Sequence, residues 1–105
     1  LGAMLNPWQP ALIASLNQIA IESKKAGIYS GVCGESGSDP AFAVVLAGMG
    51  YDSVSSSRSQ VGAVRTALSS VTHDEAREVF EAAISGHDSD EAKSLALTKL
   101  GEIAK

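Results

Sequence analysis

Apolar side chains recur three and four positions apart over the first part of the chain, which predicts an amphipathic helix that begins at Pro10. The apolar positions of this stripe are Leu12, Ile13, Leu16, Ile19 and Ala20. Proline is tolerated at the first helical position because its missing N–H would have no partner there. Gly27 suits the C-cap, and Lys24 and Lys25 favour the negative end of the helix dipole. We therefore expect this helix over residues 10–26.

Two short apolar runs predict strands on either side of a second helix. Residues 28–33 are bounded by glycines and predict a buried strand. Residues 52–56 are a weaker strand candidate, since serine is a poor strand former. Between these runs, Asp39 can cap and Pro40 can begin a helix through Gly48 that is apolar on nearly all sides and needs to be covered. The order strand, helix, strand predicts a βαβ unit with parallel strands and a right-handed crossover.

The rest of the chain has helical periodicity. Residues 58–68 carry an apolar side formed by Val61, Val64 and Leu68. Thr72 and Glu75 have the spacing of a capping box, which predicts a helix that stops at Gly86. That helix presents Ala76, Val79, Phe80 and Ala83. A final helix is expected from Asp88 or Ser89 to about residue 104, and its apolar positions are Ala92, Leu95, Leu97, Leu100 and Ile103.

The expected fold class is α/β, but two parallel strands form too little sheet to stand alone, because parallel sheets normally have several strands and both faces covered. The chain is therefore interpreted as part of a larger domain, or as a helical protein with a vestigial sheet. Residues 1–5 contribute to no pattern and are interpreted as a cloning remnant or disordered start, so the domain is expected over residues 6–105. Trp8 is expected to anchor the start of the domain by packing.

Composition and charge exclude several classes of function. The net charge of −4 over 105 residues, with scattered Lys and Arg, argues against a nucleic-acid or acidic-membrane partner. The most apolar run, residues 41–49, is far shorter than the roughly 20 residues that span a bilayer, and the start lacks the pattern of a secretion signal. One cysteine can form no internal disulfide, and no Cys/His spacing resembles a zinc site, which suits a reducing cytoplasm.

Cys33, where the first predicted strand becomes a glycine-rich loop, is the candidate functional residue. In parallel α/β folds, chemistry is normally placed at the carboxyl ends of strands. The loop lacks the lysine of a P-loop and the spacings of a dinucleotide fingerprint or a nucleophile elbow. Three interpretations of the thiol remain open: a small buried hydrophobe, a nucleophile once deprotonated, or an acid that gives a proton to a carbanion-like carbon.

Several segments together resemble a known family. They are Gly-Val-Cys-Gly-Glu at 31–35, Asp-Pro-Ala at 39–41, Gly-Met-Gly-Tyr-Asp-Ser-Val-Ser-Ser-Ser at 48–57 and Val-x-x-Val-Arg at 61–65. They are similar to the C-terminal region of phosphoenolpyruvate-utilising enzymes, and most similar to the branch that phosphorylates a protein in the bacterial sugar phosphotransferase system. The resemblance extends from about Pro10 to Arg65, and more loosely to the end.

This resemblance implies that the chain is the C-terminal fragment of a (β/α)8 barrel, about two strands and their helices, which binds phosphoenolpyruvate and Mg²⁺. The phosphoryl group would pass to a histidine on a separate domain and then to a phosphocarrier protein. Cys33 would be the proton donor that converts enolpyruvate to pyruvate, and Gly34 and Glu35 would be candidates for contact with substrate. An unperturbed thiol, with a pKa of about 8.5, is mostly protonated at pH 7 and suits this role.

The family's metal-binding carboxylates, phosphate-binding arginines and phosphorylated histidine precede this segment, so the fragment is expected to be inactive alone and to hold no metal ligand. His73 and His87 are interpreted as solvated surface residues. The alternatives are a fragment of pyruvate phosphate dikinase or phosphoenolpyruvate synthase, and a non-catalytic helical interaction module with a structural Cys33. Strand edges left open in a barrel fragment predict a homodimer or higher self-association.

Overall fold

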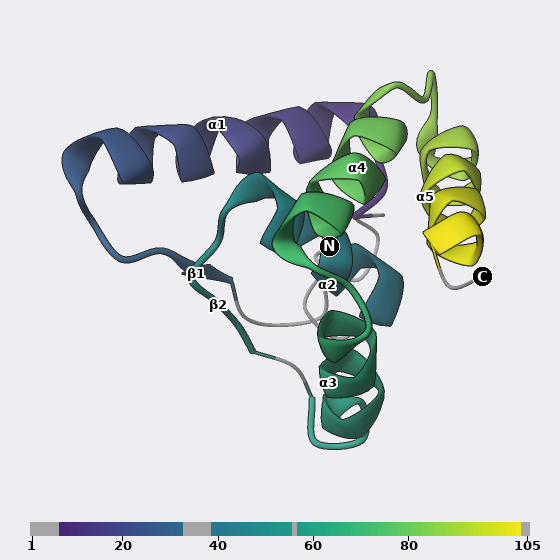
Figure 1. Cartoon of the computed structure of the whole chain (residues 1–105). Helices are drawn as coiled ribbons and strands as arrows, with labels where there is room; N and C mark the ends of the chain where they lie inside the picture. Colours follow the sequence, from purple (N-terminus) through teal and green to yellow (C-terminus); the bar gives the residue numbers. More distant parts are fainter. Residues whose placement is uncertain (1–6, 33–38, 56, 104–105) are drawn as a thin grey trace.

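The computed structural model describes residues 7–32, 39–55 and 57–103. Five helices and two strands follow one another in this part of the chain (Figure 1). In order they are α1 (Pro10–Ala26), β1 (Gly31–Val32), α2 (Pro40–Met49), β2 (Ser53–Val54), α3 (Val61–Ser69), α4 (His73–Ile84) and α5 (Ser89–Ile103). Within these residues no helix is long and apolar enough to cross a membrane.

The two strands lie side by side and are parallel, as the sequence predicted, with Gly31 opposite Ser53 and Val32 opposite Val54. Among the described residues they are shorter than predicted, and Cys33 and Ser56, at the ends of the two predicted strands, lie outside those residues. Residues 28–30 precede β1 instead of belonging to it, since the backbone N–H of Ser30 donates to the side chain of Asp52 and not to a strand carbonyl. The prediction of a buried strand was also wrong for Ile28 and Tyr29, which are 61% and 72% exposed.

The helix termini follow the local signals. Pro10 opens α1, and Gly27 ends it with a φ of +70°, a left-handed conformation in which glycine meets no steric cost. The capping box of α4 is present, with Thr72 and Glu75 in both reciprocal hydrogen bonds. Asp88 accepts from the backbone N–H of Glu91 at 2.8 Å and so caps α5. In contrast, α3 begins three residues later than predicted, at Val61, and Gln60 makes no side-chain cap.

Helix α2 is the centre of the molecule. It is buried along almost its whole length, as its apolar sequence predicted, and α4 covers it while α5 packs beside α4 (Figure 1). The close approach of α2 and α4 depends on Gly48, where a Cβ would lie 2.3 Å from the carbonyl oxygen of Ala76. The largest fully buried side chains are Phe42, Ile13, Leu46, Val44, Val45 and Val79.

Three apolar positions of the predicted helix stripes are exposed: Ile19 on α1, Val61 on α3 and Leu97 on α5. Beside Ile19 and Leu97, the smaller Ala20 and Ala96 are buried. The periodicity of apolar residues shows which residues share one face of a helix. Which of them are buried depends on the elements that pack against that face in the tertiary fold.

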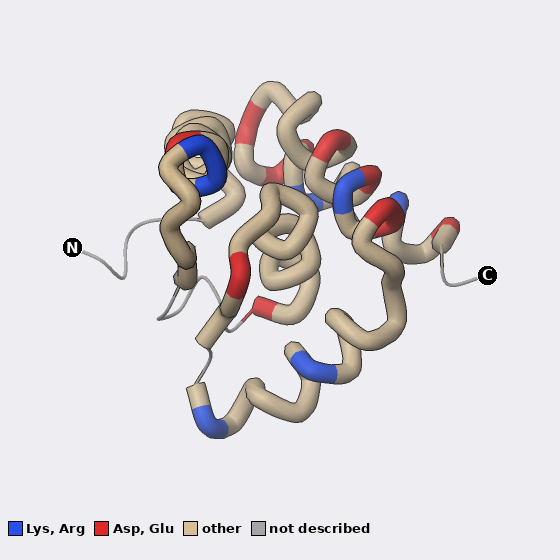
Figure 2. The backbone as a smooth tube through the Cα atoms, turned by 60° about the vertical axis from the view of Figure 1, so that its left-hand side comes forward, with Lys and Arg blue, Asp and Glu red and all other residues tan. Residues whose placement is uncertain are grey.

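Charged residues are distributed over the helices without a concentrated basic surface in the described part of the chain (Figure 2). Lys24 pairs with Asp52 at 3.0 Å, and Lys99 lies 3.4 Å from Glu78 on the neighbouring helix. The positive charges are thus partly neutralised by carboxylates of the same chain.

Candidate functional site

The predicted site residues Cys33, Gly34 and Glu35 lie outside the described residues. The structure does describe both flanks of these residues: β1, which ends at Val32, and Asp39, which precedes α2. Side-chain hydrogen bonds join each flank to a distant part of the chain.

The first attachment joins β1 to β2 and α1 through Asp52. One carboxylate oxygen accepts from the backbone N–H of Ser30 at 2.8 Å and from its hydroxyl at 3.4 Å, while the other accepts from Lys24 Nζ at 3.0 Å. In return, the carbonyl of Ser30 accepts from the backbone N–H of Asp52. The hydrogen bond from Ser30, followed by that from Lys24, lowers the pKa of Asp52 below its ordinary value. This carboxylate therefore fixes the register of the strand that leads to Cys33.

The second attachment joins the start of α2 to the segment before α1. Asp39 Oδ1 accepts from the backbone N–H groups of Ala41 and Phe42 at 3.0 and 3.3 Å, which confirms the predicted cap. Its other oxygen, Oδ2, accepts from Trp8 Nε1 at 3.1 Å. The Trp8 ring is 2% exposed and packs edge-to-face on Phe42 with centroids 5.0 Å apart. Trp8 is thus an anchor, as predicted.

Because β1 and β2 are parallel, their carboxyl ends lie at the same edge of the sheet. An open groove of about 610 Å³ begins at this end of β2 and runs along α3. Its lining residues are Val54, Ser55, Val61, Val64, Arg65, Leu68 and Ser69. Arg65 and Ser55 are polar residues that the sequence reasoning did not propose for the site. Ser55 directly follows β2 and so lies at the edge where the carboxyl ends of the parallel strands meet. That position is the sequence signal that could have identified Ser55 as a candidate site residue.

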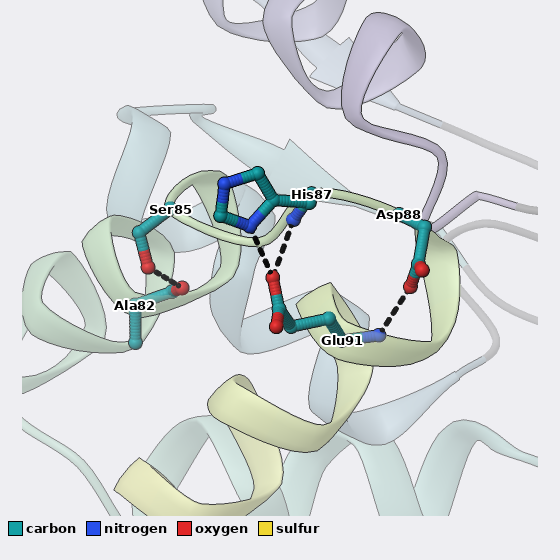
Figure 3. Close-up of polar contacts among 5 residues, drawn as sticks. All are labelled: Ala82, Ser85, His87, Asp88 and Glu91. Atoms are coloured by element: carbon teal, nitrogen blue, oxygen red, sulfur yellow. Dashed lines mark hydrogen bonds and ion pairs between the residues drawn. The ribbon is translucent and has the colours of Figure 1, made fainter.

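The two histidines are not among the residues that line this groove. His73 is exposed at the first position of α4. His87, between α4 and α5, is almost fully exposed, and its Nδ1 lies 2.7 Å from Glu91 Oε1 (Figure 3). The hydrogen bond to Glu91 raises the pKa of His87 and lowers the pKa of Glu91. Glu91 Oε1 also accepts from the backbone N–H of His87, so the pair orders the α4–α5 turn.

No three metal-ligating side chains come together in the described parts of the chain, 7–32, 39–55 and 57–103. The acidic residues at the starts of α4 and α5 serve the helix ends: Glu75 completes the capping box and Asp88 caps α5. None of these residues is therefore assigned to a metal ion.

Comparison with known proteins shows the family to which this parallel βαβ unit belongs. Residues 1–73 match the family model of the PEP-utilising enzymes, PEP-binding domain, and the chain belongs to this family. The resemblance proposed from the segments around Cys33 is thereby confirmed.

Among curated proteins, the chain is 35% identical over 91 residues to the phosphoenolpyruvate-protein phosphotransferase of Streptomyces coelicolor, covering 87% of this chain and 16% of that protein. It is 31% identical over 88 residues to the phosphoenolpyruvate-protein phosphotransferase of Latilactobacillus sakei, covering 84% and 15%. It is 28% identical over 92 residues to multiphosphoryl transfer protein 1 of Escherichia coli K12, covering 88% and 11%. The chain thus spans less than a fifth of these relatives and matches their C-terminal part.

Proposed function

We propose that this chain is the C-terminal segment of the phosphoenolpyruvate-binding (β/α)8 barrel of an enzyme that transfers the phosphoryl group of phosphoenolpyruvate to a protein histidine. The observation that carries the proposal is the family match over residues 1–73. The names of the relatives favour a protein phosphotransferase over pyruvate phosphate dikinase or phosphoenolpyruvate synthase. The phosphocarrier protein that takes the group from the histidine, and the cytoplasmic location, belong to the same proposal.

Within this reaction Cys33 is the proton donor. Transfer of the phosphoryl group breaks the bond between phosphorus and the enol oxygen and forms a bond to the histidine nitrogen, which leaves the enolate of pyruvate. The Cys33 thiol then gives its proton to the terminal carbon, and the electron pair of the enolate oxygen forms the ketone of pyruvate. The resulting thiolate regains a proton from water. A thiol with a pKa of about 8.5 holds its proton at neutral pH, so it suits an acid better than a nucleophile.

Gly34 and Glu35 are proposed to contact the substrate beside Cys33, and the groove that contains Arg65 supports a ligand-facing role for the carboxyl edge of the sheet. Mg²⁺ would neutralise phosphoryl charge in the complete enzyme. The described residues offer it no cluster of ligands, so no step here uses it. The segment alone is expected to be inactive, because phosphoryl transfer depends on charge stabilisation by groups from outside it.

The test replaces Cys33 by Ala in the full-length enzyme. General acid catalysis typically contributes about 10²–10⁴-fold, so enzymatic formation of pyruvate should fall by about that factor. Phosphorylation of the histidine in a single turnover should persist, because it precedes protonation. In D₂O, the wild-type enzyme should deliver deuterium to one face of the enol, and the variant should lose this preference. Unchanged pyruvate formation would contradict the role of Cys33.

The open surfaces of the segment support a second proposal, that the 105-residue chain associates with itself. Each strand has one partner among the described residues, and the apolar side chains of Ile19, Ile28 and Tyr29 are exposed. In this proposal the association covers surfaces that the rest of the barrel would cover in the complete enzyme.

A further inference from the structure

The second half of helix α1 presents an apolar groove that no other part of the described chain covers. The groove has a volume of about 400 Å³ and is lined by Gln18, Ile19, Glu22, Ser23, Ala26 and Ile28. We propose that a second copy of the chain covers this groove with its own α1, so that the two α1 helices lie antiparallel about a twofold axis. This inference rests on the proposal that the chain associates with itself, and it identifies the contact through which it does so.

The apolar face of α1 extends further than the core that it packs against. Leu16 packs against the core and Ala20 is fully buried, but no later residue of α1 is buried. Figure 1 shows this end of α1 extending past α2 and α4. Ile19 follows Leu16 on the same face and is 55% exposed, and Ile28 beside it is 61% exposed. An apolar helix face of this kind normally packs against a partner.

The side chains of the groove suit a second α1 helix. Ser23 and Ala26 are small, so another helix can approach closely there, whereas Ile19 is large and exposed. A twofold axis makes a surface its own partner, so large and small side chains must lie on the same surface. With the axis beside Glu22 and Ser23, Ile19 of each copy lies opposite Ala26 of the other. The groove thus contains both halves of the contact that two α1 helices would make.

The charges beside the groove also favour a second copy. Lys24 is paired with Asp52 of its own chain. Glu22 and Lys25 lie 3.9 Å apart, with side chains 58% and 71% exposed. In the antiparallel arrangement, Glu22 of each copy approaches Lys25 of the other. These two charges cancel, so two copies do not repel each other at this face although the chain carries a net charge of −4. A strongly acidic or basic partner would find no complementary charge here.

The groove is small for a protein interface. Standard interfaces involve about 20–30 residues on each side, whereas six residues line this groove. We therefore expect a weak dimer, which forms at chain concentrations of about 0.1–1 mM. Sedimentation equilibrium of the 105-residue chain over this range measures the dissociation constant.

The experiment reverses the two charges in separate variants. Lys25→Glu places a glutamate opposite Glu22 of the other copy, and Glu22→Lys places a lysine opposite Lys25. Each variant alone should raise the dissociation constant about three- to tenfold, because an exposed ion pair is weak but the twofold axis repeats it. An equal mixture of the two variants should associate at least as tightly as the wild type, because every lysine at the contact then meets a glutamate. Mixing cannot restore the ion pair within one helix, so this recovery is specific to a contact between copies.

The control mixture combines Glu22→Lys with Lys93→Glu, which makes the same change of charge as Lys25→Glu at an exposed position of α5. Its members have the same net charges as the test mixture, but it should not recover. If the wild type associates and the two mixtures behave alike, the contact between the α1 helices is wrong, self-association stands, and another segment is left to cover the groove. If the mass of the wild type does not change with concentration, self-association itself fails, and the α1 contact with it.

Discussion

The carboxylate of Asp52 joins three elements, since it accepts hydrogen bonds from Ser30 before β1 and from Lys24 on α1 while its own backbone leads into β2. These bonds favour the charged form and lower its pKa. A carboxyl group whose pKa is lower in the folded than in the unfolded state stabilises the fold above its unfolded pKa, and that contribution is lost as the pH falls through the folded pKa.

We therefore expect Asp52→Asn to reduce the free energy of unfolding at pH 7, and the deficit to shrink once the pH falls below about 4, the unfolded pKa of aspartate. Urea unfolding at pH 7, 5 and 3 measures this difference. Asp74→Asn, which removes a carboxylate at the exposed start of α4, is the control for the change in net charge. A deficit that stays constant down to pH 3 would show that the ionised form is not responsible.

The sequence predicted the hydrogen bonds of a side chain where its partner lies within a few positions along the chain. Asp39 was predicted as the cap of α2 because its backbone partners follow within three positions. The bond from Trp8 to the same carboxylate could not be predicted, because it joins residues that only the tertiary fold brings together. For the same reason the chemical motif around Cys33 was recognised from neighbouring residues, whereas Arg65 and Ser55 became candidates only when the groove was seen.

At the scale of elements, α2 and α4 approach closely at Gly48. A methyl group there would lie within 3 Å of the backbone of Ala76 and of Phe80 Cβ, so the helices would have to separate. Gly48→Ala should lower the free energy of unfolding by about 1–3 kcal/mol, the usual cost of overpacking, despite the better helix propensity of alanine. Gly101→Ala is the matched control, because nothing lies within 4 Å of the added methyl. Gly101→Ala should leave the free energy of unfolding unchanged or raise it by up to about 1 kcal/mol. Thermal unfolding of both variants measures these changes.

The turn between α4 and α5 contains a second pH-dependent contact, between His87 and Glu91 (Figure 3). The raised pKa of His87 means that its contribution is complete below its unfolded value, about 6.5, and is lost as the pH rises through the folded pKa. The lowered pKa of Glu91 means that its contribution is present above about 4.5 and is lost as the pH falls through the folded pKa. The pair should therefore stabilise the turn most between these two values.

His87→Asn keeps the backbone N–H that donates to Glu91 and removes only the ring. The thermal midpoint of this variant should be lower than that of the wild type at pH 5.5, and the difference should be smaller at pH 8.5. Scanning calorimetry at the two values measures the difference. A larger effect at pH 8.5 than at pH 5.5 would contradict the assignment of the stabilisation to the protonated ring.

At the scale of the whole molecule, the sequence predicted the order of the elements, the parallel βαβ unit and the central covered helix, because each depends on local periodicity and end signals. The sequence did not predict the lengths of the strands correctly, nor which apolar residues are buried. Ile28 and Tyr29 read as a buried strand, yet they are exposed beside a sheet of two strands. Periodicity identifies a face that needs a partner, but it does not say whether that partner lies in the same 105 residues.

The exposed apolar surface formed by Ile28 and Tyr29 predicts that the chain associates with itself. We expect the weight-average mass of the chain in sedimentation to rise with concentration, because association would cover the apolar side chains near β1 and pair the edge of β1 that has no strand partner among the described residues. Ile28→Lys should shift the chain toward monomer, since it places a charge on the exposed apolar surface that precedes β1 and so opposes the burial of that surface.

Leu97→Lys tests whether that effect is specific to the sheet edge. Leu97 is also a large exposed apolar residue, but it belongs to α5, on the opposite side of the molecule from β1 (Figure 1). Any general gain in solubility from an added lysine should appear in both variants, whereas dissociation through the surface near β1 should appear only in Ile28→Lys. A wild-type mass that does not change with concentration, or equal dissociation by the two variants, would mean that the surface near β1 does not mediate association of the chain.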